Sequence, residues 1–214
     1  METRTDHSRR PEAHPIIEEY GQLASDYDAR WSFYVEATTR ETLARLTLRP
    51  GERLLDVGCG TGAPLHRLSH SPGVQLTGVD PVPEMLAVAR RRLLPEIDLR
   101  AGWAEQLPFD REQFDIAVSC NAFHYFRDPL AALREMKRVL APGGRLVLTD
   151  WCDDDLACRL CSLYLRLFNR AHTKVYQARE CLLLLQEAGF EAVHVDRYKI
   201  NWLWGLMTAT GSLP

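Results

Sequence analysis

Long apolar segments are missing from this sequence of 214 residues. A membrane-spanning helix needs roughly 20 consecutive apolar residues, whereas the apolar run at 181–185 ends after five. The beginning of the chain is polar and lacks the apolar centre of a signal peptide. The sequence therefore predicts no membrane span, and residues 1–15 are expected to form a disordered leader.

A strong excess of charge of one sign is missing as well, because the formal net charge is -3. No overall field would draw the protein to nucleic acid or to an anionic membrane. The densest basic cluster, at 90–92, lies near the predicted end of a helix, where cations suit the helix dipole. The charge balance therefore argues against nucleic acid as a partner.

Metal-site signatures are sparse although the chain has six cysteines. With no secretory signal, these thiols are expected to be reduced and the protein to be cytoplasmic. Cys152, Cys158 and Cys161 cluster, but no second C-x-x-C or histidine pair at zinc spacing accompanies them. Core packing and thiol ligation of a metal or metalloid both remain open for these cysteines. His66 and His70 lack the H-E-x-x-H acid, so no metal site is predicted.

What the sequence does contain is a regular alternation of strand and helix patterns. Helices are expected in 16–46, with a break near 21 or 25–28, and at 63–71, 83–93, 129–142, 152–170 and 176–190. Strands are expected at 53–58, 74–80, within 97–110, from 114, and at 144–151, 191–200 and 202–211. This alternation implies a parallel sheet covered by helices. The last two strands are joined too closely for a parallel crossover, so they should form an antiparallel hairpin.

The predicted fold is thus α/β, with a doubly wound sheet of about seven strands. The sheet is mostly parallel, ends in a C-terminal antiparallel hairpin, carries helices on both faces and is preceded by an N-terminal helical lid. One domain is expected over 16–214. The helical lid is expected at 16–48 and the ligand-binding core at 49–151. A variable substrate-side helical segment is expected at 152–176, and the last helix with the hairpin at 177–214.

The stretch LLDVGCGTG at 54–62 carries the most specific signal. From Gly58 onward it fits the dinucleotide pattern G-x-G-x-x-G/A, and no Gly-Lys-Ser/Thr follows that would make it a P-loop. Asp80 closes the second strand, where an acid can hold ribose hydroxyls. Asp56, two residues before Gly58, would repel a pyrophosphate and attract an ammonium group. S-adenosylmethionine (SAM) has a ribose, an ammonium group and no phosphate, so these two acids favour it over a dinucleotide.

From 54 to 151 the sequence resembles the class I SAM-dependent methyltransferases. LLDVGCGTG looks like their first motif, and LTGVDPVPEML is similar to their second. AGWAEQLPFD, FDIAVSCNAFHYFRD and LREMKRVLAPGGRLVLTDW resemble the later blocks in order. The resemblance is closest to the small-molecule branch, which includes the ubiquinone and menaquinone biosynthesis methyltransferases. It implies a Rossmann-like fold and SAM as the cofactor.

The resemblance also implies roles for individual residues. Asp56 would reach the ammonium group of SAM, directly or through water, Asp80 would hold the ribose, and Tyr27 would belong to the lid. The implied cofactor-binding residues are Tyr27, Asp56, Gly58, Gly60, Asp80, Pro81, Met85, Ala104, Glu105, Ser119 and Asn121. Trp103 departs from the pattern, because many relatives carry there an acid that accepts from the adenine amino group.

His124 is the candidate general base. Methyl transfer is an in-line displacement, so alignment supplies most of the catalysis, and a base helps only if the acceptor loses a proton. His124 follows the fourth strand at the carboxyl edge of the sheet, where α/β proteins bind ligands. The other reading is a structural histidine that shapes the pocket wall. Tyr125 and Trp151 join His124 as predicted substrate contacts.

The leading functional prediction is methyl transfer from SAM to a small-molecule acceptor, apolar or aromatic. A nucleic-acid methyltransferase usually carries Asn/Asp-Pro-Pro-aromatic where this chain reads SCNAFHYF. A thiol-dependent metalloid methyltransferase would need the cysteine cluster. An inactive interaction module of the same fold stays open because of Trp103. The sequence leaves the oligomeric state open.

Overall fold

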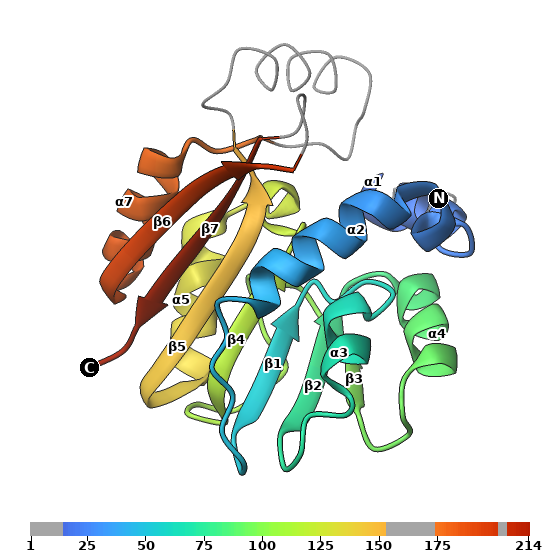
Figure 1. Ribbon diagram of the computed structural model, residues 1–214, viewed down its shortest axis with the longest axis horizontal. Coiled ribbons are helices and arrows are strands. Elements are labelled where there is room, and N and C mark those ends of the chain that lie inside the picture. Colours follow the sequence, from blue (N-terminus) through green and yellow to red (C-terminus); the bar gives the residue numbers. More distant parts are fainter. Residues whose placement is uncertain (1–14, 153–173, 201–204) are drawn as a thin grey trace, which may run out of the picture.

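The computed structural model describes residues 15–152, 174–200 and 205–214 (Figure 1). The expected leader, apart from Pro15, lies outside the described residues. So do most of the variable segment expected at 152–176 and, with it, Cys158 and Cys161. The rest of the chain forms a central sheet with helices on both faces (Figure 1).

The sheet has seven strands in the order β3-β2-β1-β4-β5-β7-β6. Neighbours from β3 to β5 pair in parallel, whereas β7 is antiparallel to both β5 and β6. The strands are β1 Arg53–Val57, β2 Gln75–Asp80, β3 Asp98–Ala101, β4 Phe114–Cys120, β5 Leu140–Trp151, β6 Glu191–Lys199 and β7 Gly205–Ser212. The predicted mostly parallel sheet with a C-terminal antiparallel hairpin is confirmed. The last strand folds back into the sheet, so β7 lies between β5 and β6.

Prolines in the first turn and a glycine after the last turn mark the ends of several helices. They are α1 Pro15–Leu23, α2 Tyr27–Leu43, α3 Ala63–Leu68, α4 Pro83–Arg92, α5 Pro129–Val139 and α7 Ala178–Ala188, with the short 3-10 turn η1 at Phe123–Tyr125. Proline occupies the first turn of α3, α4 and α5, where its missing N–H costs nothing. Gly189, with φ +90°, ends α7 as predicted. The predicted break in 16–46 falls at 24–26, while Gly21 lies inside α1.

Two predicted helix ends were wrong. The helix expected at 63–71 already ends at Leu68. The helix expected at 129–142 ends at Val139, and β5 already begins at Leu140. Leu140 has extended backbone angles, and Pro142 two residues later cannot continue a helix. The β5 strand therefore starts four residues earlier than the expected start at Gly144.

Successive side chains along each strand point to opposite faces of the sheet, so each face has its own hydrophobic core. Leu54, Ile116 and Val147 point to the side of α3 and α4, and all three are at most 2% exposed. Their chain neighbours, such as Leu55 and Leu146, point to the opposite side, where α5 and α7 pack. Side chains of this size contribute about 1.5–3 kcal/mol each when fully buried.

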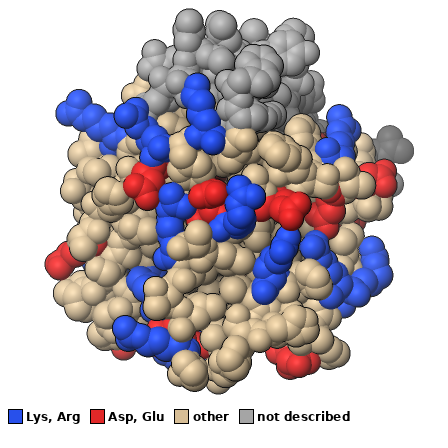
Figure 2. Space-filling view, in the orientation of Figure 1, with Lys and Arg blue, Asp and Glu red and all other residues tan. Residues whose placement is uncertain are grey.

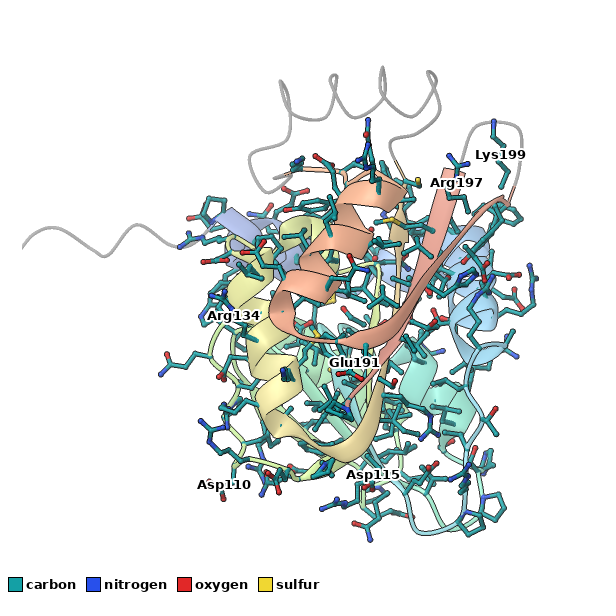
Figure 3. The ribbon with its side chains drawn as sticks, turned by 90° about the vertical axis from the view of Figure 1, so that its left-hand side faces the viewer. Asp110, Asp115, Arg134, Glu191, Arg197 and Lys199 are labelled. Atoms are coloured by element: carbon teal, nitrogen blue, oxygen red, sulfur yellow. The ribbon has the colours of Figure 1, made fainter. Side chains whose placement is uncertain are left out.

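The carboxyl ends of β1, β2, β4 and β5 meet at one edge of the sheet, where α1 and α2 also lie (Figure 1). Figure 3 shows this edge from the side, with Arg197 and Lys199 at the same end. Asp110 and Asp115 lie at the opposite end. Loops at the carboxyl edge of a parallel sheet are where α/β proteins bind ligands, so the fold places the predicted site residues where a site is expected.

Candidate active site

The glycine loop follows β1 and has a backbone that only glycine adopts easily. Gly58, Gly60 and Gly62 have φ values of +74°, +51° and +80°. A Cβ on Gly58 would lie 2.4 Å from the Cβ of Ala122, at the end of β4. At Gly58 the loop therefore passes so close to the residues that follow β4 that a side chain is excluded, whereas a Cβ on Gly60 would meet nothing within 4 Å.

Asp80, at the end of β2, holds this loop in place. Its Oδ2 accepts a hydrogen bond from the backbone N–H of Gly60 at 2.8 Å, and its Oδ1 accepts from Val82 at 2.9 Å. Burial raises the pKa of Asp80 to about 6, although both backbone donors oppose this. The carboxylate is fixed by the protein on one side and still lines the adjoining cavity.

Asp56 lies further back than a direct contact with an ammonium group in the cavity would require, so of the two predicted contacts the one through water fits this position better. It is fully buried in β1 and does not line the cavity, and neither carboxylate oxygen has a hydrogen-bond partner among the described residues. Burial, and then the nearby Asp80, raise the pKa of Asp56 to about 8. Ser119 is also fully buried, and its hydroxyl donates to the carbonyl of Val57 at 2.9 Å. The structure thus places both behind the loop rather than at the cavity surface.

The first cavity opens above the glycine loop and holds about 880 Å³ of space, part of it open to solvent. The predicted cofactor residues that line it are Tyr27, Gly58, Gly60, Asp80, Pro81, Met85, Ala104, Glu105 and Asn121. Trp103 also lines it, and Glu105 accepts a hydrogen bond from the backbone N–H of Arg127 at 2.9 Å.

The second cavity lies beside the first and is largely aromatic. Its lining residues are Glu19, Tyr20, Leu23, Tyr27, Trp31, Tyr34, Asn121, His124, Tyr125 and Trp151. The three predicted substrate contacts are therefore together in one cavity. Tyr20, Tyr27, Asn121 and Tyr125 line both cavities and form the boundary between them. The hydroxyl of Tyr20 donates a hydrogen bond to that of Tyr125, which ties α1 to η1.

His124 and Asp150 form a buried pair in the wall of the second cavity. The imidazole Nδ1 lies 2.6 Å from Oδ1 of Asp150, with the two side chains 5% and 1% exposed. The same carboxylate accepts from the backbone N–H groups of His124, at 2.9 Å, and Trp151, at 2.6 Å. The ring of His124 also stacks on Trp151, with centroids 5.7 Å apart and planes at 25°.

Comparison with known proteins shows a similarity to methyltransferases. A family model described as a methyltransferase domain matches residues 55–148. The O-methyltransferase cnsE of Penicillium expansum is 32% identical over 168 residues, which are 76% of this chain and 60% of that protein. The demethylmenaquinone methyltransferase of Chlorobaculum tepidum is 40% identical over 97 residues, 44% of this chain and 40% of that protein.

A solved structure shows the same fold. It is a putative methyltransferase of Haloferax volcanii in complex with the Trm112 methyltransferase activator, with a TM-score of 0.80 and 22% identity. The alignment covers 92% of this chain and 98% of that chain. Residues 55–148 of the chain thus match a methyltransferase domain, and the fold is that of a solved methyltransferase. The chain spans between 33% and 60% of the length of the curated relatives it matches.

The first cavity fits SAM, the cofactor of the methyltransferases that the chain resembles. Among the described residues that line it, none is lysine or arginine, whereas Asp80 and Glu105 supply carboxylates. Such a lining does not repel a sulfonium or ammonium cation, and among the described residues it offers no cationic side chain to a pyrophosphate. When bound, SAM supplies a methyl group on a positively charged sulfur. Gly58 and Gly60 would give its methionyl part room, and Asp80 would meet the ribose.

Several residues of this methyltransferase site were missed by sequence reasoning. Cys59, Thr61 and Cys120 line the first cavity, and Thr61 is fixed by a 2.7 Å hydrogen bond to Asp28 of α2. Asp150 was missed too, because its role depends on β4 and β5 being neighbours. In the sequence, the one hint of a role for Asp150 is that it directly precedes Trp151, a predicted substrate contact.

Metal ligation finds no support in the part of the chain that the structure describes. There, no three histidine, cysteine or acidic side chains come together as a metal site. Cys152 is buried in the α5–α7 core, while Cys158 and Cys161 lie outside the described residues. No described helix is long and apolar enough to cross a membrane.

Proposed function

We propose that this methyltransferase transfers a methyl group from SAM to a small-molecule acceptor. The observation that carries the proposal is the shared boundary between the two cavities, made by Tyr20, Tyr27, Asn121 and Tyr125. A cofactor in the first cavity and an acceptor in the second would meet there. The second cavity is lined mainly by aromatic side chains, which suits a small apolar or aromatic molecule.

The names of two relatives agree with this proposal. The Penicillium protein is named an O-methyltransferase, and the Chlorobaculum protein is named for demethylmenaquinone. A cytoplasmic location, expected from the reduced cysteines, is part of the proposal. Methyl transfer here requires the protein to align the acceptor with the methyl group and exclude water, which α1 and α2 favour by lying over the carboxyl edge.

A nucleic-acid acceptor is the second candidate, and charge argues against it. Lysine and arginine are mixed with acidic residues over the face in Figure 2, with no broad basic patch there. The net charge is -3, and no described residue lining either cavity is lysine or arginine. Nucleic-acid affinity depends mainly on neutralising phosphates with such residues.

Thermal unfolding with added ligands tests the cofactor assignment. SAM, or its demethylated product S-adenosylhomocysteine (SAH), should raise the melting temperature, because both bind the folded protein only. NAD, which carries a pyrophosphate, should leave it unchanged. A shift with NAD alone would contradict the proposal and favour a dinucleotide-binding protein. No shift with SAM, SAH or NAD would contradict it too and favour an inactive module of this fold.

A further inference from the structure

The boundary between the two cavities contains a buried side-chain oxygen that no described residue pairs. Asn121 lines both cavities, and its Oδ1 has no hydrogen-bond partner in the part of the chain that the structure describes. A buried acceptor that stays unpaired destabilises a protein. A ligand that donates a hydrogen bond at this boundary would satisfy the oxygen.

The orientation of the Asn121 amide follows from its neighbours. The hydroxyl of Thr38 donates to the carbonyl of Tyr34 at 2.8 Å, so its oxygen accepts from Nδ2 of Asn121 at 2.7 Å. The backbone N–H of Asn121 donates to the carbonyl of Thr149 at 2.9 Å. Its φ of +60° lies in the left-handed region, which asparagine tolerates better than most residues. The amide nitrogen is therefore engaged, and the oxygen is the atom left for a ligand.

The lining of the second cavity favours positive charge. Six of its ten described residues are tyrosine or tryptophan, and the faces of such rings attract cations. Glu19 also lines it, whereas none of the described lining residues is lysine or arginine. Burial, and then the carboxylate of Asp150, raise the pKa of Tyr34 well above its ordinary value. An anion is therefore disfavoured in this cavity and a cation is favoured.

Methyl transfer brings positive charge into this cavity only if the acceptor atom keeps it, as nitrogen does. SAM carries its charge on sulfur, so an amine would react beside it in the uncharged form. After the transfer the cofactor is neutral at sulfur and the nitrogen is positive, among aromatic faces that attract it. A hydroxyl would instead have to give its proton to a base, and the amide oxygen of Asn121 is not one.

We infer that the second cavity binds a primary or secondary amine, and that Oδ1 of Asn121 accepts a hydrogen bond from the N–H of the reacting nitrogen. This inference rests on the proposed function and narrows it to one class of acceptor. The ammonium form of the amine first releases a proton to water. The nitrogen lone pair then forms a bond to the methyl carbon. The S–CH₃ bond breaks, and sulfur keeps the electron pair as a neutral thioether, so the product is a methylated ammonium ion.

Two ligands of the same shape test the preference for positive charge before the acceptor is known. They are the (meta-hydroxyphenyl)trimethylammonium ion and its uncharged counterpart, meta-tert-butylphenol. In protein saturated with SAH, calorimetry should show that the cation binds about tenfold more tightly than the phenol. Saturation with SAM, which is itself positively charged, should weaken binding of the cation and not of the phenol. Equal affinities in the SAH complex, or tighter binding of the phenol, overturn the inference and leave the proposed function intact.

Product chemistry tests the acceptor class in a natural mixture. The full-length protein is incubated with SAM deuterated at its methyl group and a small-molecule extract of the cells that make it. Mass spectrometry should find deuterium, apart from SAM and its breakdown products, in compounds that a cation exchanger retains at low pH and that alkali does not cleave. Deuterium in neutral ethers or in esters overturns the inference and leaves the proposed function intact. No transfer despite SAH binding removes the proposed function itself.

Asn121→Ala tests the hydrogen bond to the reacting nitrogen. At saturating SAM, transfer into the amine products should slow at least about tenfold, as expected when a hydrogen bond to a group that becomes charged is lost. The affinity for SAH, measured by calorimetry, should stay close to that of wild type. Asn121→Asp keeps an acceptor oxygen at this position and should restore most of the rate.

The control for Asn121→Ala is Glu112→Ala. Glu112 has a φ of +59°, so alanine there imposes a similar backbone strain, but Glu112 lines neither of the two cavities. This variant should transfer methyl groups like wild type. A wild-type rate in Asn121→Ala overturns the inference. A loss of SAH affinity as large as the loss of rate overturns it as well, because Asn121 would then act on the cofactor.

Discussion

Asp80 and Gly60 are joined by a 2.8 Å hydrogen bond from the backbone of the glycine loop to the carboxylate at the end of β2. The carboxylate therefore shapes the loop and faces the first cavity at once. Asp80→Ala should lower SAH affinity at least tenfold and abolish the thermal shift with SAM. Asp98→Ala, an exposed acid at the start of β3, is the control and should bind SAH like wild type. Unchanged binding by Asp80→Ala would contradict the ribose assignment.

Gly58 should tolerate no side chain, and Gly51 supplies the comparison. Both have positive φ, but a Cβ on Gly51 meets nothing within 4 Å, whereas on Gly58 it would lie 2.4 Å from Ala122. Gly51→Ala should cost about 1–2 kcal/mol of unfolding free energy, for the backbone alone. Gly58→Ala should cost clearly more and weaken SAH binding. Urea unfolding measures both, and equal losses would contradict the close approach.

Asp56 should make stability fall as pH rises. Its pKa is raised to about 8 in the folded protein, while an unfolded aspartate ionises near pH 3.9. Between these two pKa values the unfolded chain has released a proton that the native carboxyl still holds. The free energy of unfolding is therefore highest below about pH 4 and declines as the pH rises to 8. Asp56→Asn, which does not titrate, should gain on the order of a few kcal/mol over wild type between pH 5 and 9. Parallel stability curves would contradict this.

The same carboxyl gives SAH binding a pH dependence. A bound ammonium group nearby favours the ionised form of Asp56, so affinity for SAH should rise several-fold from pH 6 to pH 9. In Asp56→Asn this rise in SAH affinity should be much smaller. Any remaining change should occur below pH 7 and come from Asp80, whose pKa is raised to about 6. Calorimetry at several pH values measures this. A pH-independent wild-type affinity would contradict the prediction that Asp56 senses the ammonium group.

Asp28 links α2 to the cofactor loop and to α4. Its carboxylate accepts from Thr61 at 2.7 Å and from Arg92 at 2.7 Å. Asp28→Ala should lower the unfolding free energy by about 1 kcal/mol or less, as expected for a partly exposed pair, yet weaken SAH binding by about tenfold. Glu36→Ala, which breaks the exposed pair with Arg67 at 3.0 Å, is the control and should leave binding unchanged. Equal SAH affinity in the two variants would contradict a role of α2 in the site.

Local patterns explain how much of the fold was predictable. The buried runs that precede Gly58 and follow Phe114, and the prolines that open α3, α4 and α5, are readable along the chain. Right-handed crossovers fix the face of the sheet on which each connecting helix lies, but they do not fix the strand order β3-β2-β1-β4-β5. The insertion of β7 between β5 and β6 had no such local signal, although the short connection predicted the antiparallel pairing itself.

Site residues could be predicted from the sequence where they belong to one continuous motif. Gly58, Gly60 and Asp80 belong to motifs, and the structure places them around one cavity. The pairing of His124 with Asp150 depends on two strands meeting in space, so no spacing in the sequence marks it. The burial of Asp56 and Ser119 was equally hidden, because it depends on which face of β1 and β4 each residue occupies.

Transfer of a labelled methyl group from SAM is the most direct test of the proposed function. Purified wild-type protein and Asp80→Ala are incubated with labelled SAM and the small-molecule extract. The expected result is label in a low-molecular-weight product with wild type, and a rate at least about tenfold lower with Asp80→Ala at limiting SAM. No transfer by wild type, or label found only in nucleic acid or protein added to the same mixture, would contradict it.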